Sequence, residues 1–200
     1  SRWVVQIPGT QDWSPTRTSN PVDLTSNVHL MTQEQQTALQ RQVAKAMSAA
    51  GIQPGDPVML TGHSQGGIAA ASFAADPAFL ERFTVTAVVT GGSPIARIDI
   101  PDSVSVLSVE HTQDPVPMLD GRDNPAKSNW VTVKAEADAQ AITRSTQQAP
   151  TPADAHSTVR YEDTGELVDS SSDPNVAGLR TTIDPFLHGE GTVTRWQISG

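Results

Sequence analysis

The sequence predicts an α/β fold in which a mostly parallel central sheet carries helices on both faces. Short apolar runs rich in β-branched residues recur along the chain, which is typical of buried parallel strands. These runs are Trp3–Ile7, Pro57–Thr61, Phe83–Thr90, Ser103–Val109 and Trp130–Lys134. Segments with helical spacing separate several of them, which favours crossover connections between parallel strands. No internal repeat or linker interrupts the chain, so we expect a single domain over residues 1–200.

The first strand is followed by a long polar stretch and then by a helix. Residues 11–30 show little periodicity, so we expect a surface loop there. Thr32, with Gln35 three residues later, fits a capping box at the start of the helix. Apolar residues then recur at helical spacing until Gly51, which predicts the end of that helix. Because the chain opens on a strand, we expect that further residues preceded it in a longer precursor.

The later elements continue the alternation. Small residues over Gly66–Ala75 predict a helix, which Asp76-Pro77 breaks. Residues 154–166 are charged and show no helical stripe, so we interpret them as a loop. We expect a helix over Asn175–Phe186 and a last, edge-like strand over Thr192–Ile198.

The composition excludes several kinds of function. A formal net charge of −9 argues against a nucleic-acid partner, which requires a basic surface, and less strongly against adsorption to anionic lipid. Without cysteine the chain has no disulfide, no thiolate metal site and no cysteine nucleophile. No stretch approaches the roughly 20 apolar residues of a membrane span, so we expect none. Motifs for dinucleotides, phosphate loops and zinc proteases are missing, and we interpret the acidic clusters as solvated loops. We therefore expect neither a cofactor nor a metal.

The stretch Gly62-His63-Ser64-Gln65-Gly66 lies where a predicted strand turns into a predicted helix. Such a sharp turn crowds the backbone, and glycines two residues before and after the turning residue relieve the crowding. The side chain of Ser64 would then project from the carboxyl edge of the sheet, where ligands of parallel sheets bind. This pattern and context predict a nucleophile elbow.

Four stretches of the chain resemble the α/β-hydrolase superfamily, and within it the class 3 lipases and their bacterial lipase- and esterase-like relatives. They are the elbow Gly62–Gly66, Thr90-Gly91-Gly92-Ser93-Pro94, Asp114-Pro115-Val116-Pro117, and Pro8-Gly9-Thr10. The second is similar to the family's G-S-P segment, the third to its D-x-V-P stretch with the catalytic acid, and the fourth to the end of its oxyanion strand. The resemblance implies the α/β-hydrolase fold and a Ser-His-Asp triad, and it favours a secreted or cell-envelope location over a cytoplasmic one.

A serine needs a general base and an orienting carboxylate to become a nucleophile. On this fold the chain order is Ser, then Asp or Glu, then His. Asp114 follows the strand Ser103–Val109 and is the predicted acid, with Glu110, Asp120 and Asp123 as reserves. The stretch from His156 to Tyr161 is similar to the family's histidine followed shortly by tyrosine. His156 is the predicted base, and His188, which follows the last predicted helix, is the alternative.

Two backbone amides should stabilise an oxyanion. The first is that of Gln65, directly after the nucleophile, and the second is that of Thr10, in the loop after the first strand. We expect His63, His111 and Trp13 to line the substrate site.

These residues predict a serine carboxyl-ester hydrolase that forms an acyl-enzyme on a small-molecule or lipid ester. A thioesterase, an acyltransferase or a peptidase on the same triad is an alternative, as is a hydrolase-like binding domain without catalysis. The sequence makes no prediction of the acyl length, the alcohol or the oligomeric state.

Overall fold

The computed structural model describes residues 1–9, 33–137 and 151–197 and has a five-stranded sheet in the order β1–β2–β3–β4–β5. All neighbouring strands pair in parallel. The strands are β1 (Trp3–Ile7), β2 (Pro57–His63), β3 (Thr84–Gly91), β4 (Ser105–His111) and β5 (Trp130–Ala135). The predicted α/β class with a mostly parallel sheet is confirmed, and each expected strand before residue 136 is present within two residues of its predicted bounds.

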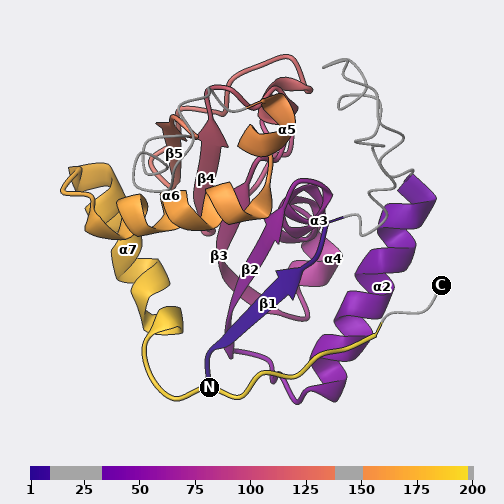
Figure 1. The fold of residues 1–200 in the computed structure, drawn as a ribbon. Helices are drawn as coiled ribbons and strands as arrows, with labels where there is room; N and C mark the ends of the chain where they lie inside the picture. Colours follow the sequence, from indigo (N-terminus) through magenta and orange to yellow (C-terminus); the bar gives the residue numbers. More distant parts are fainter. Residues whose placement is uncertain (10–32, 138–150, 198–200) are drawn as a thin grey trace.

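Helices cover both faces of this sheet (Figure 1). One face carries α2 (Gln33–Ala49), α3 (Gln65–Ala74) and α4 (Pro77–Leu80), whereas the other carries α6 (Thr158–Ser170) and α7 (Pro174–Leu187). Two further elements are short, η1 (Val116–Met118) and α5 (Pro152–Ala155), and Figure 1 shows α5 near the tips of the β4 and β5 arrows. Helices on both faces bury both sides of the strands, as a parallel sheet requires.

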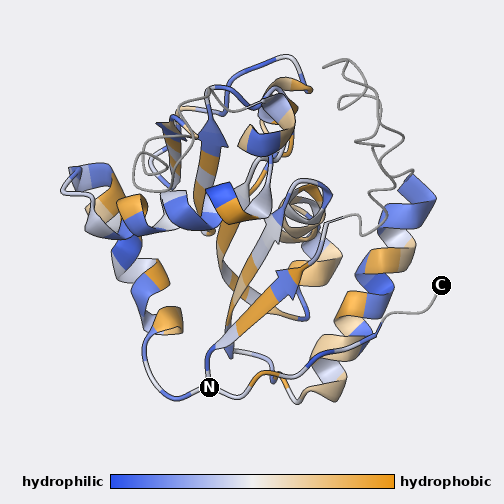
Figure 2. Ribbon diagram, in the orientation of Figure 1, coloured by the Kyte–Doolittle hydropathy of each residue, from blue (hydrophilic) through white to orange (hydrophobic). Residues whose placement is uncertain are grey.

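The core is divided by the sheet into two apolar clusters. Along β2, Val58 and Leu60 belong to the cluster beneath α2 and α3, whereas Met59 between them belongs to the cluster beneath α6 and α7. The same alternation places Val106 of β4 in the first cluster and Leu107 in the second. Figure 2 shows the resulting apolar colouring along the strands. Successive side chains of a strand point to opposite faces, so continuous apolar runs serve both layers.

The strand register aligns the residues that follow β2, β3 and β4. Gly62 lies beside Thr90, and Gly91 lies beside Val109. Because the strands are parallel, the turns after them open at one carboxyl edge, where ligands of such sheets bind. All four stretches quoted for the family resemblance begin at this edge, since Pro8 directly follows the end of β1.

Two of the later predictions differ from the structure. Residues 158–170 form helix α6, where we expected a loop; its buried residues Tyr161, Thr164 and Val168 recur at helical spacing, but only one of them is aliphatic. The expected last strand over Thr192–Ile198 is wrong, since residues 191–197 form no strand and Val193 is 87% exposed. β-Branched residues form a strand only where a neighbouring strand and a buried face receive them.

Some predictions fall on residues outside the described part of the chain. The surface loop over 11–30, the capping residue Thr32 and the site residues Thr10 and Trp13 all lie there.

Candidate active site

The turn from β2 into α3 holds Ser64 in a strained conformation. Its φ is 54° and its ψ is −122°, and it is the one residue other than glycine with a positive φ in the described part of the chain. Such strain costs of order 1–3 kcal/mol and persists only where the surroundings enforce it. A Cβ on Gly62 would lie 2.2 Å from the carbonyl carbon of Gly66, and a Cβ on Gly66 would lie 2.2 Å from the Ile7 oxygen. The two glycines therefore permit the close approach of β1, β2 and α3 that the elbow requires.

The end of β3 and the residues after it hold the backbone of this turn. The Ser64 amide donates to the Gly91 oxygen at 2.9 Å, and the Ser64 carbonyl accepts from the Ser93 hydroxyl at 2.9 Å and from the Gly67 amide at 3.1 Å. A Cβ on Gly67 would lie 2.1 Å from the Ser93 Oγ, so the approach of this hydroxyl requires glycine. Hydrogen bonds that join Gly91 and Ser93 to the Ser64 backbone thus stabilise the strained conformation of the serine.

Ser64, His156 and Asp114 form a chain of hydrogen bonds. The distance from His156 Nε2 to Ser64 Oγ is 2.9 Å, and that from His156 Nδ1 to Asp114 Oδ2 is 2.7 Å. The three residues are 5%, 2% and 3% exposed, respectively. An ionised carboxylate only accepts, so Nδ1–H donates to it and Nε2 is left to accept the serine proton. This is the hydrogen-bond pattern of a nucleophile with its general base.

The Asp114 carboxylate is fixed by its place between β4 and η1. Its Oδ1 accepts from the Val116 amide at 2.9 Å, and its own amide donates to the His111 oxygen at 3.1 Å. Pro115, in the first turn after it, has a φ of −76°. A carboxylate bonded to the amide two residues later is a turn-stabilising arrangement, which leaves Oδ2 free to face His156.

His156 lies at the carboxyl end of α5. A capping box begins this helix: the Thr151 hydroxyl accepts from the Asp154 amide, and the Asp154 side chain accepts from the Thr151 amide. The oxygen of Ala155, the residue before His156, accepts from His111 Nδ1 at 2.6 Å. A short helix tied down at both ends therefore presents the imidazole.

Tyr161 of α6 belongs to the same cluster, although the sequence did not single it out as a site residue. Its hydroxyl donates to Asp114 Oδ2 at 2.7 Å, and its ring stacks on His111 with 3.9 Å between centroids. The sequence signal for it was the similarity of the stretch from His156 to Tyr161 to the family. A buried tyrosine hydroxyl usually has a hydrogen-bond partner, and here that partner is the carboxylate.

His63 and His111, both expected to line the substrate site, occupy different environments. The ring of His63 lies 4.7 Å from that of His156, and its Nδ1 lies 3.4 Å from Thr158 Oγ1. Burial, reinforced by the nearby His156, lowers the pKa of His63 to about 4. His111 is 2% exposed and uses both ring nitrogens, with Nε2 lying 2.7 Å from Thr164 Oγ1. His111 is thus a buried residue that links the end of β4 to α5 and α6 by hydrogen bonds.

Gly92 lies against the hydrogen-bonded side chains. Its φ is +60°, and a Cβ there would lie 3.0 Å from Tyr161 Cε2 and 3.1 Å from both Asp114 Oδ2 and His156 Nδ1. Any side chain at this position would displace the groups that the site brings together.

The other candidate groups lie apart from this cluster. The reserve carboxylates are engaged elsewhere: Glu110 with the Asn124 amide group, Asp120 with the Ala96 amide and Asp123 with Lys134 Nζ. Burial raises the pKa of Glu110. His188 is exposed at the end of α7, where its Nδ1 lies 2.8 Å from the Asp184 oxygen. Figure 1 shows that α7 ends at the edge of the sheet opposite α5. Gln65, the predicted oxyanion donor, is the first residue of α3.

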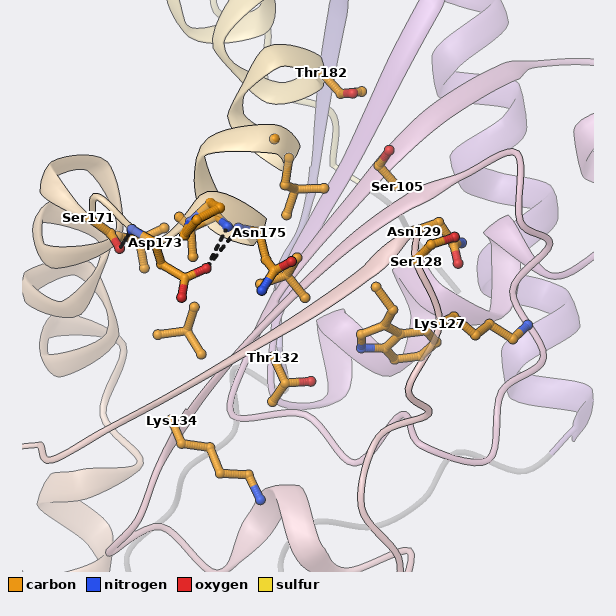
Figure 3. A pocket seen from close by; sticks show the side chains of 18 of the residues that line it. Ser105, Lys127, Ser128, Asn129, Thr132, Lys134, Ser171, Asp173, Asn175 and Thr182 are labelled. Carbon is orange, nitrogen blue, oxygen red and sulfur yellow. Dashed lines mark hydrogen bonds between the residues drawn. The ribbon is translucent and has the colours of Figure 1, made fainter.

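A cavity of about 670 Å³ lies along β5 and against α6 and α7. Figure 3 shows Ser171, Asp173 and Asn175 on one side of the strand and the side chains of Thr132 and Lys134 on its other side. The described residues that line it do not include Ser64, Asp114 or His156, so it is distinct from the candidate active site.

The described residues include neither a membrane-spanning helix nor a metal-binding cluster. None of the helices there combines the length and the apolar character that a membrane span needs. Nor do three or more histidine, aspartate or glutamate side chains gather in that part of the chain in a way that could hold a metal ion.

Comparisons with known proteins add little to this geometry. No protein-family model matches the chain, and no curated protein matches it. Among solved structures, the chain is similar to a protein from Pectobacterium atrosepticum described as a YdeN-like hydrolase. The two are 19% identical, the match covers 68% of this chain and 78% of that one, and the TM-score is 0.36. A likeness at this level does not bear on the function of this chain.

Proposed function

We propose that this chain is a serine hydrolase of carboxyl esters, lipase- or esterase-like, built as a single α/β-hydrolase domain. Ser64 is the nucleophile, His156 the general base and Asp114 the orienting carboxylate. The observation that carries the proposal is the 2.9 Å contact between His156 Nε2 and Ser64 Oγ on a strained strand-to-helix turn. Strained residues cluster at functional sites, and a serine bonded to an imidazole that a buried carboxylate holds has the geometry of covalent acyl transfer.

The proposed reaction proceeds in two halves. Ser64 Oγ attacks the ester carbonyl carbon while His156 Nε2 takes its proton, and the resulting imidazolium is stabilised by Asp114 Oδ2. The imidazolium then protonates the leaving alcohol, and an acyl-serine ester remains. Water, activated by His156, attacks this ester, releases the carboxylic acid and restores the Ser64 hydroxyl.

Two backbone amides would stabilise the tetrahedral oxyanion. The Gln65 amide begins α3, and the positive end of a helix dipole favours negative charge there. The Thr10 amide is the proposed second donor and stays a prediction. The loss of one such donor typically costs about 3 kcal/mol in the barrier.

Other acyl substrates would use the same three residues. A panel of aryl esters, acyl thioesters and blocked peptides separates an esterase from a thioesterase or a peptidase, and added alcohol acceptors reveal acyl transfer. We expect the aryl esters to turn over faster than the thioesters and the peptides.

Labelling with a fluorophosphonate probe tests the proposal directly. We expect the folded wild-type protein to be labelled at Ser64 and Ser64→Ala to take up no label. His156→Ala and Asp114→Asn should each lower the labelling rate and ester turnover by several orders of magnitude, on the order of 10⁴-fold.

Two matched variants show whether the loss of a histidine or an aspartate elsewhere in the chain also lowers the labelling rate. His188→Ala and Asp123→Asn remove exposed groups of the same kinds away from the site and should label at the wild-type rate. A folded wild-type protein that resists the probe and hydrolyses no ester would support the non-catalytic binding domain instead.

A further inference from the structure

We propose that Tyr161 is a positioning residue that holds the Asp114 carboxylate in place for His156. The inference rests on the proposed function, because it concerns how the same three residues would work. It adds a fourth side chain to the site, one that acts on the reaction through Asp114.

The hydrogen bonds around Asp114 show how the carboxylate is held. Its Oδ1 accepts from the Val116 amide at 2.9 Å, whereas its Oδ2 accepts from both Tyr161 Oη at 2.7 Å and His156 Nδ1 at 2.7 Å. Without Tyr161, Oδ2 would be positioned by the His156 imidazole alone. The phenol is therefore the second fixed point that prevents rotation of the carboxylate about its Cβ–Cγ bond.

The direction of the Tyr161 hydrogen bond follows from its partners. The His111 amide lies 3.1 Å from Tyr161 Oη and can only donate, so the phenol oxygen accepts there. The Asp114 carboxylate can only accept, so the phenol proton goes to Oδ2. Burial and the neighbouring Asp114 raise the pKa of Tyr161 well above its usual range, so the donor stays protonated.

The ring of Tyr161 is held as firmly as its hydroxyl. It is stacked on His111 at an interplanar angle of 16°, and its centroid lies 5.3 Å from that of His63. Gly91 and Gly92 also pack against this ring, since added Cβ atoms on them would lie 3.1 Å and 3.0 Å from Tyr161 ring carbons. These contacts come from β2, β3 and β4, so the phenol is fixed relative to the three strand ends that form the site.

This arrangement has two consequences for His156. A fixed Oδ2 keeps the imidazole in the orientation in which Nε2 reaches Ser64, so Tyr161 should contribute to turnover more than to substrate binding. The phenol also shares the negative charge of Oδ2, which lowers the stabilisation that Asp114 gives to the imidazolium. The other titratable groups around this pair are His63, His111 and Glu110.

Tyr161→Phe tests the inference, with three quantities measured: kcat per serine titrated by the fluorophosphonate probe, KM, and the acid limb of kcat/KM against pH. We expect kcat to fall about 10- to 100-fold, since small misplacements cost up to about 100-fold, with KM unchanged. The acid limb should move to higher pH, because Oδ2 no longer shares its charge with a phenol.

Trp130→Phe is the matched control. It removes a buried aromatic N–H that bonds to Ser108 Oγ at 3.1 Å, outside the site. A comparable loss of stability with wild-type kcat and an unchanged acid limb is the expected result. A drop in kcat in both variants would indicate a structural role for Tyr161 and would overturn the positioning role.

A second measurement does not depend on the folding of Tyr161→Phe. The chain contains one tyrosine, so biosynthetic incorporation of ring-fluorinated tyrosine changes this ring alone. Fluorination makes the phenol a stronger donor, and the acid limb should then move to lower pH, opposite to the phenylalanine variant.

The outcomes for the inference and for the proposed function are separable. If the wild type takes up no probe and turns over no ester, the proposed function fails and the inference fails with it. If the wild type is active and neither kcat nor the acid limb responds to phenylalanine or to fluorotyrosine, the inference alone is overturned.

Discussion

Single buried polar residues decide the geometry of the candidate site. Asp114, His156, His111 and Tyr161 are each less than a tenth exposed, and each bonds to another group of the cluster. Burial of a polar group destabilises the folded state unless the group is hydrogen-bonded. The hydrogen bonds among these four residues therefore offset the cost of burying them. His63 differs from these four residues, since its buried Nε2 has no hydrogen-bond partner in the described part of the chain.

The position of His63 predicts a pH dependence of stability. Its folded pKa of about 4 lies below the ordinary 6.5, so the unfolded chain takes up a proton between these values while the folded protein does not. The free energy of unfolding should therefore fall as the pH falls from about 6.5 to 4, by at most about 3 kcal/mol, and by less because the ring is partly exposed. Urea unfolding of the wild type and of His63→Phe at several pH values measures this, and the variant should show the shallower dependence. Equal dependences in both proteins would contradict the prediction.

Among the elements, α5 and α6 place two of the buried side chains of the site. α5 presents His156 at its carboxyl end and α6 presents Tyr161 four residues into the helix. The preceding strands contribute only their ends, so the placement of the imidazole depends on how firmly these two helices are attached. The capping box of Thr151 and Asp154 begins this attachment.

Removal of the cap should loosen α5. Thr151→Ala leaves the Asp154 amide without its hydroxyl acceptor and should lower the free energy of unfolding by about 1 kcal/mol. Thr181→Ala is the matched control, because that hydroxyl only bonds the Gly178 oxygen within α7, and a change within about 0.5 kcal/mol is expected. Chemical denaturation compares the two; equal losses would show that the box does not stabilise the helix.

The whole molecule brings together groups that are remote in sequence. Ser64 and His156 are 92 residues apart, and Asp114 and His156 are 42 residues apart. The distances between these side chains depend on the pairing of β2, β3 and β4 and on the two apolar clusters that pack the helices against the sheet. Any loss of the core should therefore act on the entire site at once.

A core substitution measures how much the buried layers stabilise the fold that holds the site. Leu60 of β2 is fully buried between the sheet and α3, so Leu60→Ala should lower the free energy of unfolding by roughly 2–5 kcal/mol. Leu187→Ala, at the exposed end of α7, should change it by less than about 0.5 kcal/mol. Thermal unfolding by calorimetry distinguishes the two, and a stability loss of similar size in both variants would argue against the core described above.

The strands could be predicted because their signal is local. Continuous β-branched runs between turn residues gave β1 with its observed bounds and the later strands within two residues. Helix α6 could not be predicted from periodicity, since its buried face consists of Tyr161, Thr164 and Val168, and the first two are polar. Their burial is compensated by bonds to His111 and Asp114, partners that lie far away in the chain.

The sequence by itself determined the α/β class, the positions of the five strands along the chain and the tight turn at Ser64, because these follow from residue types that act on their immediate neighbours. It also proposed Asp114 and His156 for the site on element order and on the family resemblance, and their catalytic roles stay predictions. Only the tertiary structure decided which groups meet around them, including Tyr161 and His111. The reason is physical: hydrogen bonds between buried groups form only at distances near 3 Å, and packing of the sheet and helices, not spacing along the chain, sets such distances.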